Sequence, residues 1–148
     1  MIAEIFRESY QRELKKLREE IVLYKNENDL WVLNGEIKNC AGNLALHLIG
    51  NLRHFMGAVL SGSGYVRNRD QEFSEKNISR EKIIQDLDEV ISLVSKTISD
   101  IPDEDMLKEY PIEFLGKNRT NMELFVFLFG HLTYHLGQIN YHRRLIYS

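Results

Sequence analysis

Two histidines four residues apart are the residues of this chain best placed to do chemistry. They are His131 and His135, in the sequence His-Leu-Thr-Tyr-His, within a strongly apolar run with helical spacing. On an α-helix, residues i and i+4 share one face, with Cβ atoms about 6 Å apart. Both imidazoles can therefore bind one ion, and imidazole is a common ligand of zinc, copper, iron and nickel.

His47 is the candidate for a third ligand. It lies far upstream, on the apolar face of a second run with helical spacing. A buried imidazole must be hydrogen-bonded or bound to a metal, because burying an unpaired polar group is costly. The pair alone leaves open whether its members are ligands or ordinary buried polar residues. With His47, the three would form an open site of the kind that catalytic metals need.

The neighbours of the histidines narrow the chemistry. A metalloprotease of the H-E-x-x-H type needs a glutamate after its first histidine, and this chain has Leu132 there. A metal held by three histidines still lowers the pKa of a bound water, or binds a thiol substrate as the thiolate. Three nearby side chains are candidates to support the ligands or to contact substrate, although each also fits simple packing: Asn51, Tyr134 and Gln138.

Composition excludes several other classes of protein. The net charge is −3 without a basic cluster, so nucleic-acid binding is not expected. Cys40 is the only cysteine, which rules out an internal disulfide and a cysteine-rich zinc site. No run approaches the ~20 apolar residues of a membrane span, and the first residues do not resemble a signal peptide. We expect a cytoplasmic protein that does not enter a membrane.

Apolar spacing predicts four helices. Their expected ranges are 2–25, 39–60, 79–99 and from 120 onward, joined by long connections at 61–78 and 100–119. The last helix starts at a capping box, Thr120 to Glu123, and is apolar on nearly every side, which predicts a central or subunit-shared position. The 148 residues are the length of one domain, so we expect a single all-α four-helix bundle, with the two connections covering one end.

Glycines recur at seven-residue spacing within two of these helices. Each costs about 1 kcal/mol relative to alanine in a helix interior. Close approach of a neighbouring helix would compensate for this cost, although chance placement explains the spacing equally well. The glycines are Gly50, Gly57, Gly130 and Gly137.

The chain resembles the DinB/YfiT-like superfamily over essentially its full length. The matching segments are Asn43-Leu44-Ala45-Leu46-His47-Leu48 and His131-Leu132-Thr133-Tyr134-His135-Leu136-Gly137-Gln138. The resemblance implies a four-helix bundle that often dimerises, with a divalent zinc or nickel ion bound by His47, His131 and His135. Relatives include S-transferases and isomerases that use low-molecular-weight thiols such as bacillithiol or mycothiol, and metal-dependent hydrolases. Leu136 departs from the arginine of many relatives, which puts the particular substrate in doubt.

Two functional hypotheses follow. The first is a metal-dependent enzyme, a homodimer acting on a small molecule, in which a divalent ion on the three histidines activates a thiol or water for transfer or hydrolysis. The second is a non-catalytic dimeric helical bundle that serves as a metal-binding or interaction module. In the second case the histidines are core polar groups or a storage site.

Overall fold

The computed structural model describes all residues, 1–148, and it is all-helical without a β-strand. Two isolated β-bridges, Glu109–Thr120 and Phe114–Lys117, are the only extended pairings. The α-helices are α1 (Ile2–Leu23), α2 (Ala41–Leu52), α3 (Val59–Ser61), α4 (Arg69–Ser74), α5 (Arg80–Ser99) and α6 (Asn121–Ile146). The other helical segments are the 3₁₀ helices η1 (Glu27–Trp31) and η3 (Asp103–Asp105) and the π-helix η2 (Arg53–Ala58).

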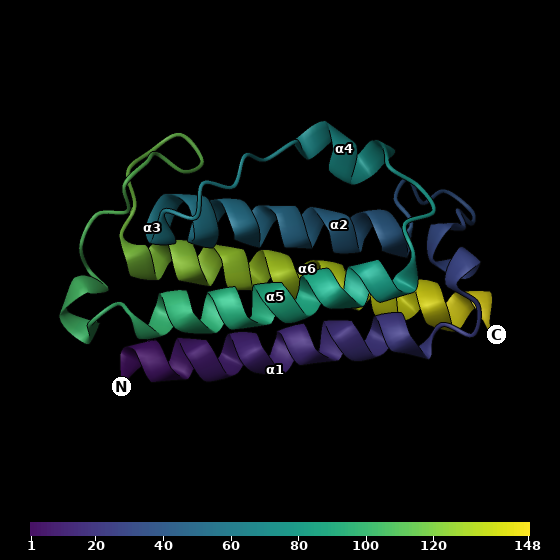
Figure 1. Ribbon diagram of the computed structural model, residues 1–148, viewed down its shortest axis with the longest axis horizontal. Coiled ribbons are helices and arrows are strands. Elements are labelled where there is room, and N and C mark those ends of the chain that lie inside the picture. The colour runs from purple at the N-terminus through teal and green to yellow at the C-terminus, as the bar shows by residue number, and fades with distance from the viewer.

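Four long helical segments lie side by side along the long axis of the molecule (Figure 1). One of them is made of α2, η2 and α3, which follow each other without a break. The α1 helix packs against α5 and α6, and α2 packs against the same two helices. This ring of contacts places α2 beside α6, although the two segments lie far apart in the sequence. No helix combines the length and apolar character that a membrane crossing requires.

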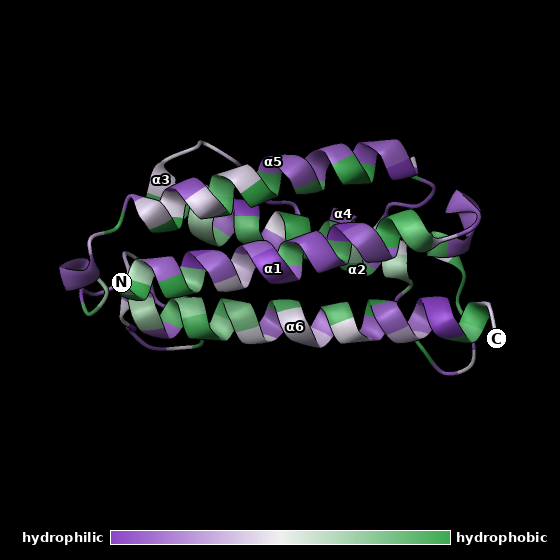
Figure 2. Ribbon diagram, turned by 90° about the horizontal axis from the view of Figure 1, so that it is seen from below, coloured by the Kyte–Doolittle hydropathy of each residue, from purple (hydrophilic) through white to green (hydrophobic).

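The core forms because each long helix has an apolar stripe with steps of three and four residues. In α1 this stripe is Tyr10, Leu14, Leu17 and Ile21, all buried. In α6 it is Leu124, Leu128, Leu132, Leu136 and Ile139. The opposite face of α6 carries exposed Val126 and Tyr134, and Figure 2 shows hydrophobic residues along its surface. Within this chain α6 is therefore not covered on every side.

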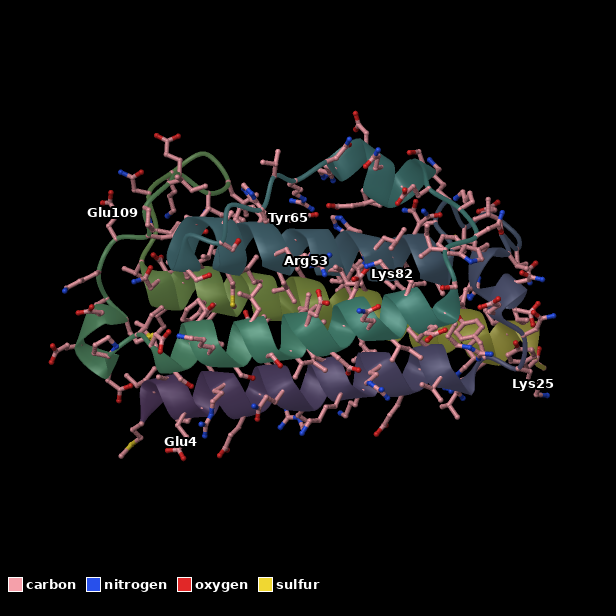
Figure 3. All side chains as sticks on the ribbon, viewed as in Figure 1. Glu4, Lys25, Arg53, Tyr65, Lys82 and Glu109 are labelled. Atoms are coloured by element: carbon pink, nitrogen blue, oxygen red, sulfur yellow. The ribbon has the colours of Figure 1, made fainter.

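The π-helix η2 interrupts the second long segment, and its first residue, Arg53, contacts α5. Its guanidinium lies 3.1 Å from Asp86 Oδ1, and Lys82 Nζ approaches the same oxygen at 2.7 Å (Figure 3). Isolated π-helical turns within α-helices occur frequently near functional sites. Here the turn directly follows the part of α2 that carries His47 and Asn51.

The connection at 61–78 is more structured than a surface loop. It contains α4, which lies along the outer side of α2 rather than at one end of the helices (Figure 1). The buried Asn43 of α2 binds it through Nδ2, which donates to the backbone oxygens of Glu72 and Glu75 at 2.9 and 2.8 Å. These bonds position the segment relative to His47, one turn further along α2.

Close neighbours compensate for the glycines of α2 and η2 but not for those of α6. A Cβ on Gly50 would lie 1.9 Å from a carboxylate oxygen of Glu72, and one on Gly57 would lie 3.1 Å from the side chain of Leu93. At Gly130 and Gly137 a Cβ would meet nothing within 4 Å. The expectation of close helix approach is therefore wrong for α6 in this chain, and at Gly50 the close neighbour is a side chain from a connection.

The capping box of α6 is confirmed and gives a test of the fold. Thr120 Oγ1 accepts from the backbone N–H of Glu123 at 3.1 Å, and the Glu123 carboxylate accepts from the N–H of Thr120 at 2.8 Å. Thr120→Ala should lower the free energy of unfolding by about 1 kcal/mol, because the backbone N–H of Glu123 loses its side-chain acceptor. Urea unfolding measures this change. Thr133→Ala on the same helix is the control and should stay within about 0.5 kcal/mol of the parent; equal effects would contradict the capping role.

Candidate metal centre

The structure brings the three candidate histidines together. His47 Nε2 lies 2.9 Å from His131 Nε2, and His131 Nε2 lies 3.1 Å from His135 Nε2. The ligand atoms that the three residues offer all lie within 4.8 Å of one another. One residue comes from α2 and two from α6, as the sequence pattern requires.

These separations fit a shared ion. Zinc lies about 2.0–2.1 Å from a histidine nitrogen, so two nitrogens on one ion at 90–110° are about 2.9–3.4 Å apart. The two closest nitrogen pairs here fall in that range. Three protein ligands leave coordination positions for water or substrate, which distinguishes catalytic sites from closed structural ones.

Glu72 fixes the orientation of His47. The Nδ1–H of His47 donates to Glu72 Oε1 at 3.0 Å. Arg67 donates to both oxygens of the same carboxylate, each at 2.9 Å. Burial alone would raise the pKa of Glu72, but the hydrogen bonds from His47 and Arg67 outweigh it and lower the pKa. The carboxylate stays charged, so His47 keeps its proton on Nδ1 and presents the lone pair of Nε2.

Gln138 does the same for His135. The Nδ1–H of His135 donates to Gln138 Oε1 at 2.7 Å, which leaves the Nε2 lone pair free. His131 differs, because its Nδ1 is buried without a hydrogen-bond partner. The Nε2 atom of His131 lies between the Nε2 atoms of His47 and His135, and each of these two carries a lone pair. An ion at their common point would bind all three lone pairs, with the remaining proton of His131 on Nδ1.

Gly50 makes room for the Glu72 carboxylate against α2. A Cβ at this position would lie 1.9 Å from Oε2 and 2.6 Å from Cδ of Glu72. The carboxylate cannot move aside freely, because His47 and Arg67 hold it on both sides. The glycine therefore permits a carboxylate to reach a histidine on the same helix.

The site favours neutral imidazoles. Burial, together with the nearby histidines and arginines, lowers the pKa of His131 to about 4. Burial also lowers the pKa of His135, although its hydrogen bond to Gln138 opposes this. Neutral imidazole is the form that binds metal, so His131 and His135 are ready to bind at neutral pH without first losing a proton.

The remaining side chains singled out in the sequence have other positions. Asn51 is buried but does not bond His47, whose second nitrogen is held by Glu72 instead. Tyr134 is 65% exposed, and its ring lies against that of His135 with centroids 5.3 Å apart. Leu136 is buried in the apolar core. Many proteins of the DinB/YfiT-like superfamily, which this chain resembles, have an arginine at this position, and this chain therefore lacks that positive charge next to His135.

Sequence reasoning missed the residues that support His47. Arg67 and Glu72 lie in a polar stretch that reads as a solvated loop, and their charges are ordinary for such a loop. A weak signal was present, because Asn68 begins a short helix as its N-cap: its side chain accepts from the N–H of Gln71 at 3.1 Å. Nothing local indicates that Glu72 becomes buried.

Filling the space at Gly50 should weaken metal binding without unfolding the chain. Gly50→Ala would displace the Glu72 carboxylate and release His47 Nδ1, while alanine favours the helix by about 1 kcal/mol. We expect a loss of zinc affinity of about 10- to 100-fold, as is typical when a partner of a ligating histidine is lost. Chelator competition measures it. Gly130→Ala, where a Cβ meets open space, is the matched control and should keep the parent affinity.

The metal-free protein should lose stability as the pH falls from about 6.5 to 4. The pKa of His131 drops from 6.5 to about 4 on folding. Between these values the unfolded chain takes up a proton that the folded chain excludes, so the free energy of unfolding falls, by about 2 kcal/mol after allowance for partial exposure. Urea unfolding in the presence of a chelator at pH 7 and pH 4.5 measures the change. His131→Gln should show a smaller change; an identical pH dependence would contradict this assignment.

A family profile described as "Protein of unknown function (DUF1572)" matches residues 4–148. No protein of curated function matches the chain. Because the profile covers nearly every residue, including all three histidines and their supporting side chains, the chain belongs to the DUF1572 family of proteins of unknown function.

Proposed function

We propose that this protein is a metal-dependent enzyme whose divalent ion, zinc or nickel, is held by His47, His131 and His135. The observation that carries the proposal is the convergence of three Nε2 atoms, with separations of 2.9 and 3.1 Å, while Glu72 and Gln138 hold the second nitrogens of two of the rings. Donors of this kind, in neutral form, suit a borderline-soft divalent ion. For the fold, we propose a four-helix bundle of the DinB/YfiT-like type.

The reaction class proposed is transfer of a low-molecular-weight thiol, with hydrolysis as the related alternative. A divalent ion with open positions supplies Lewis acidity that brings the pKa of a bound thiol or water near neutrality. The residues of the chain do the rest: burial favours the neutral form of His131 and His135, Glu72 and Gln138 orient His47 and His135, and one side of the cluster is buried in the core.

Metal content gives the direct test. Purified protein incubated with zinc and dialysed should retain about one equivalent by elemental analysis, since three neutral imidazoles form a tight site. His131→Ala and His135→Ala should each retain far less. His54→Gln is the control, because His54 lies outside the cluster, and it should retain as much as the parent. Near-zero content in the parent, or equal content in all variants, would refute the metal centre.

Turnover separates the enzyme from the non-catalytic alternative. Metal-loaded protein should accelerate the reaction of a thiol such as bacillithiol or mycothiol with an electrophile, or hydrolysis of an ester or amide, and His47→Ala should abolish the rate. Metal binding without turnover across such a panel would favour a metal-binding or interaction module. The exposed apolar residues Val126, Tyr134, Tyr141 and Leu145 on α6 would suit that role.

A further inference from the structure

A cavity of about 320 Å³ opens beside the histidine cluster. His47 and His131 contribute to its lining, together with residues from the two long connections and the first half of α6. Given that a water molecule occupies about 30 Å³ of liquid, the cavity holds roughly ten non-hydrogen atoms. Its size suits a small molecule.

The side chains that line this cavity carry positive charge, and only part of that charge is paired with a carboxylate. Two arginines line it, and no carboxylate does. The charge of Arg67 is matched by Glu72, which it binds with two hydrogen bonds. Arg69 makes no ion pair; its guanidinium lies over the ring of Phe73 at 5.4 Å. Arg69 is also near enough to His131 to contribute to its lowered pKa. One guanidinium at the cavity is therefore free to bind an anion.

Asn51 supplies a second, independent indication of a ligand. Its side chain is 7% exposed and lines the cavity, and its Oδ1 is buried without a hydrogen-bond partner. A buried polar atom without a partner is costly and therefore uncommon in folded proteins. A ligand in the cavity that carries polar groups would satisfy this amide.

The rest of the lining is apolar and includes a strained turn. Phe114, Leu115 and Phe127 line the cavity, and Phe114 pairs with Lys117 across a tight turn. Leu115 has φ +51°, a conformation that is unfavourable for a residue with a branched side chain. Arg119 holds the turn by donating from Nε to Phe114 O at 3.0 Å. The turn places Leu115, which is 68% exposed, at the rim of the cavity, and strained residues often occur at binding sites.

We propose that the cavity binds a small organic acid as substrate. Its carboxylate pairs with Arg69, a hydroxyl or amino group of the same molecule donates to Asn51 Oδ1, and a short apolar body packs against Phe114, Leu115 and Phe127. A guanidinium binds a planar carboxylate through two parallel hydrogen bonds, which favours this anion over a spherical one. The reactive end of the molecule then lies toward His47 and His131. That last element rests on the proposed metal centre, whereas recognition of the acid does not.

Cobalt-loaded protein provides one test, because thiolate binding to cobalt changes its absorption spectrum. The probes are 3-mercaptopropionate and its uncharged amide, 3-mercaptopropanamide. The parent should bind the acid roughly fivefold more tightly, as expected for a partly exposed ion pair. Arg69→Gln should remove this preference, and Arg69→Lys should retain most of it. Higher salt should weaken the preference by screening.

Arg144→Gln is the matched control. Arg144 is also an exposed arginine over an aromatic ring, that of Tyr141 at 5.2 Å, but it lies near the end of α6, outside the cavity lining. This variant should keep the full preference for the acid. Equal binding of acid and amide by the parent, or an unchanged preference in Arg69→Gln, would overturn the proposal.

A second test needs no metal. In chelator-treated, ¹⁵N-labelled protein, 2-hydroxyhexanoate, whose hydroxyl can donate to Asn51 Oδ1, should shift the side-chain amide resonances of Asn51. Its uncharged amide, 2-hydroxyhexanamide, should bind roughly fivefold more weakly, because it lacks the charge. Glycolate should bind at least about tenfold more weakly than 2-hydroxyhexanoate, because each buried CH₂ adds affinity. Asn51 resonances that none of the three compounds shifts would refute the acid site. Failure of cobalt to bind would instead refute the metal centre, so the two failures are distinguishable.

Discussion

The hydrogen bond from His47 to Glu72 is the constraint on which the candidate site depends. A buried carboxylate is unfavourable unless it is paired, and Arg67 supplies the matching charge through two hydrogen bonds. The carboxylate can reach His47 only because Gly50 leaves space on α2. Once Glu72 is fixed, it determines which nitrogen of His47 carries the proton and therefore where the free lone pair points.

Helix packing completes what this bond begins. Helix geometry alone places His131 and His135 on one face of α6, but only the packing of α2 against α6 brings His47 within 2.9 Å of them. Gln138, one turn beyond His135, fixes the third ring in the same way that Glu72 fixes the first. The cluster thus combines an arrangement within one helix with a contact between two helices.

The surroundings of the cluster differ on its two sides, and this difference favours chemistry over storage. The core side is apolar, and burial lowers the pKa values of His131 and His135, which favours their neutral form. The other side meets a cavity with an unmatched arginine, an unsatisfied amide and an aromatic wall. A closed structural metal site would have no use for such a cavity, whereas a site that binds substrate requires one.

Local patterns in the sequence were sufficient to predict the helices. Apolar steps of three and four residues and the capping box at Thr120 are set by contacts within one helix, so the predicted ranges agree with α1, α5, α6 and the segment from α2 to α3 within a few residues. The connection at 61–78 was predicted as a surface loop, because charged residues without periodicity are usually solvated. The burial of Glu72 depends on its contacts with α2, where its partner His47 lies 25 residues earlier in the sequence.

The sequence by itself therefore determined an all-helical fold and a histidine pair on one helix face, because both depend on residue spacing within single helices. Only the tertiary structure decided that His47 joins the pair and that Gly50 faces Glu72, while Gly130 and Gly137 face open space. It also decided that Arg69 remains unpaired beside a cavity. The physical reason is that these features depend on which distant segments pack together, and a charge or a glycine has the same local signature whether its neighbour is water or a buried carboxylate.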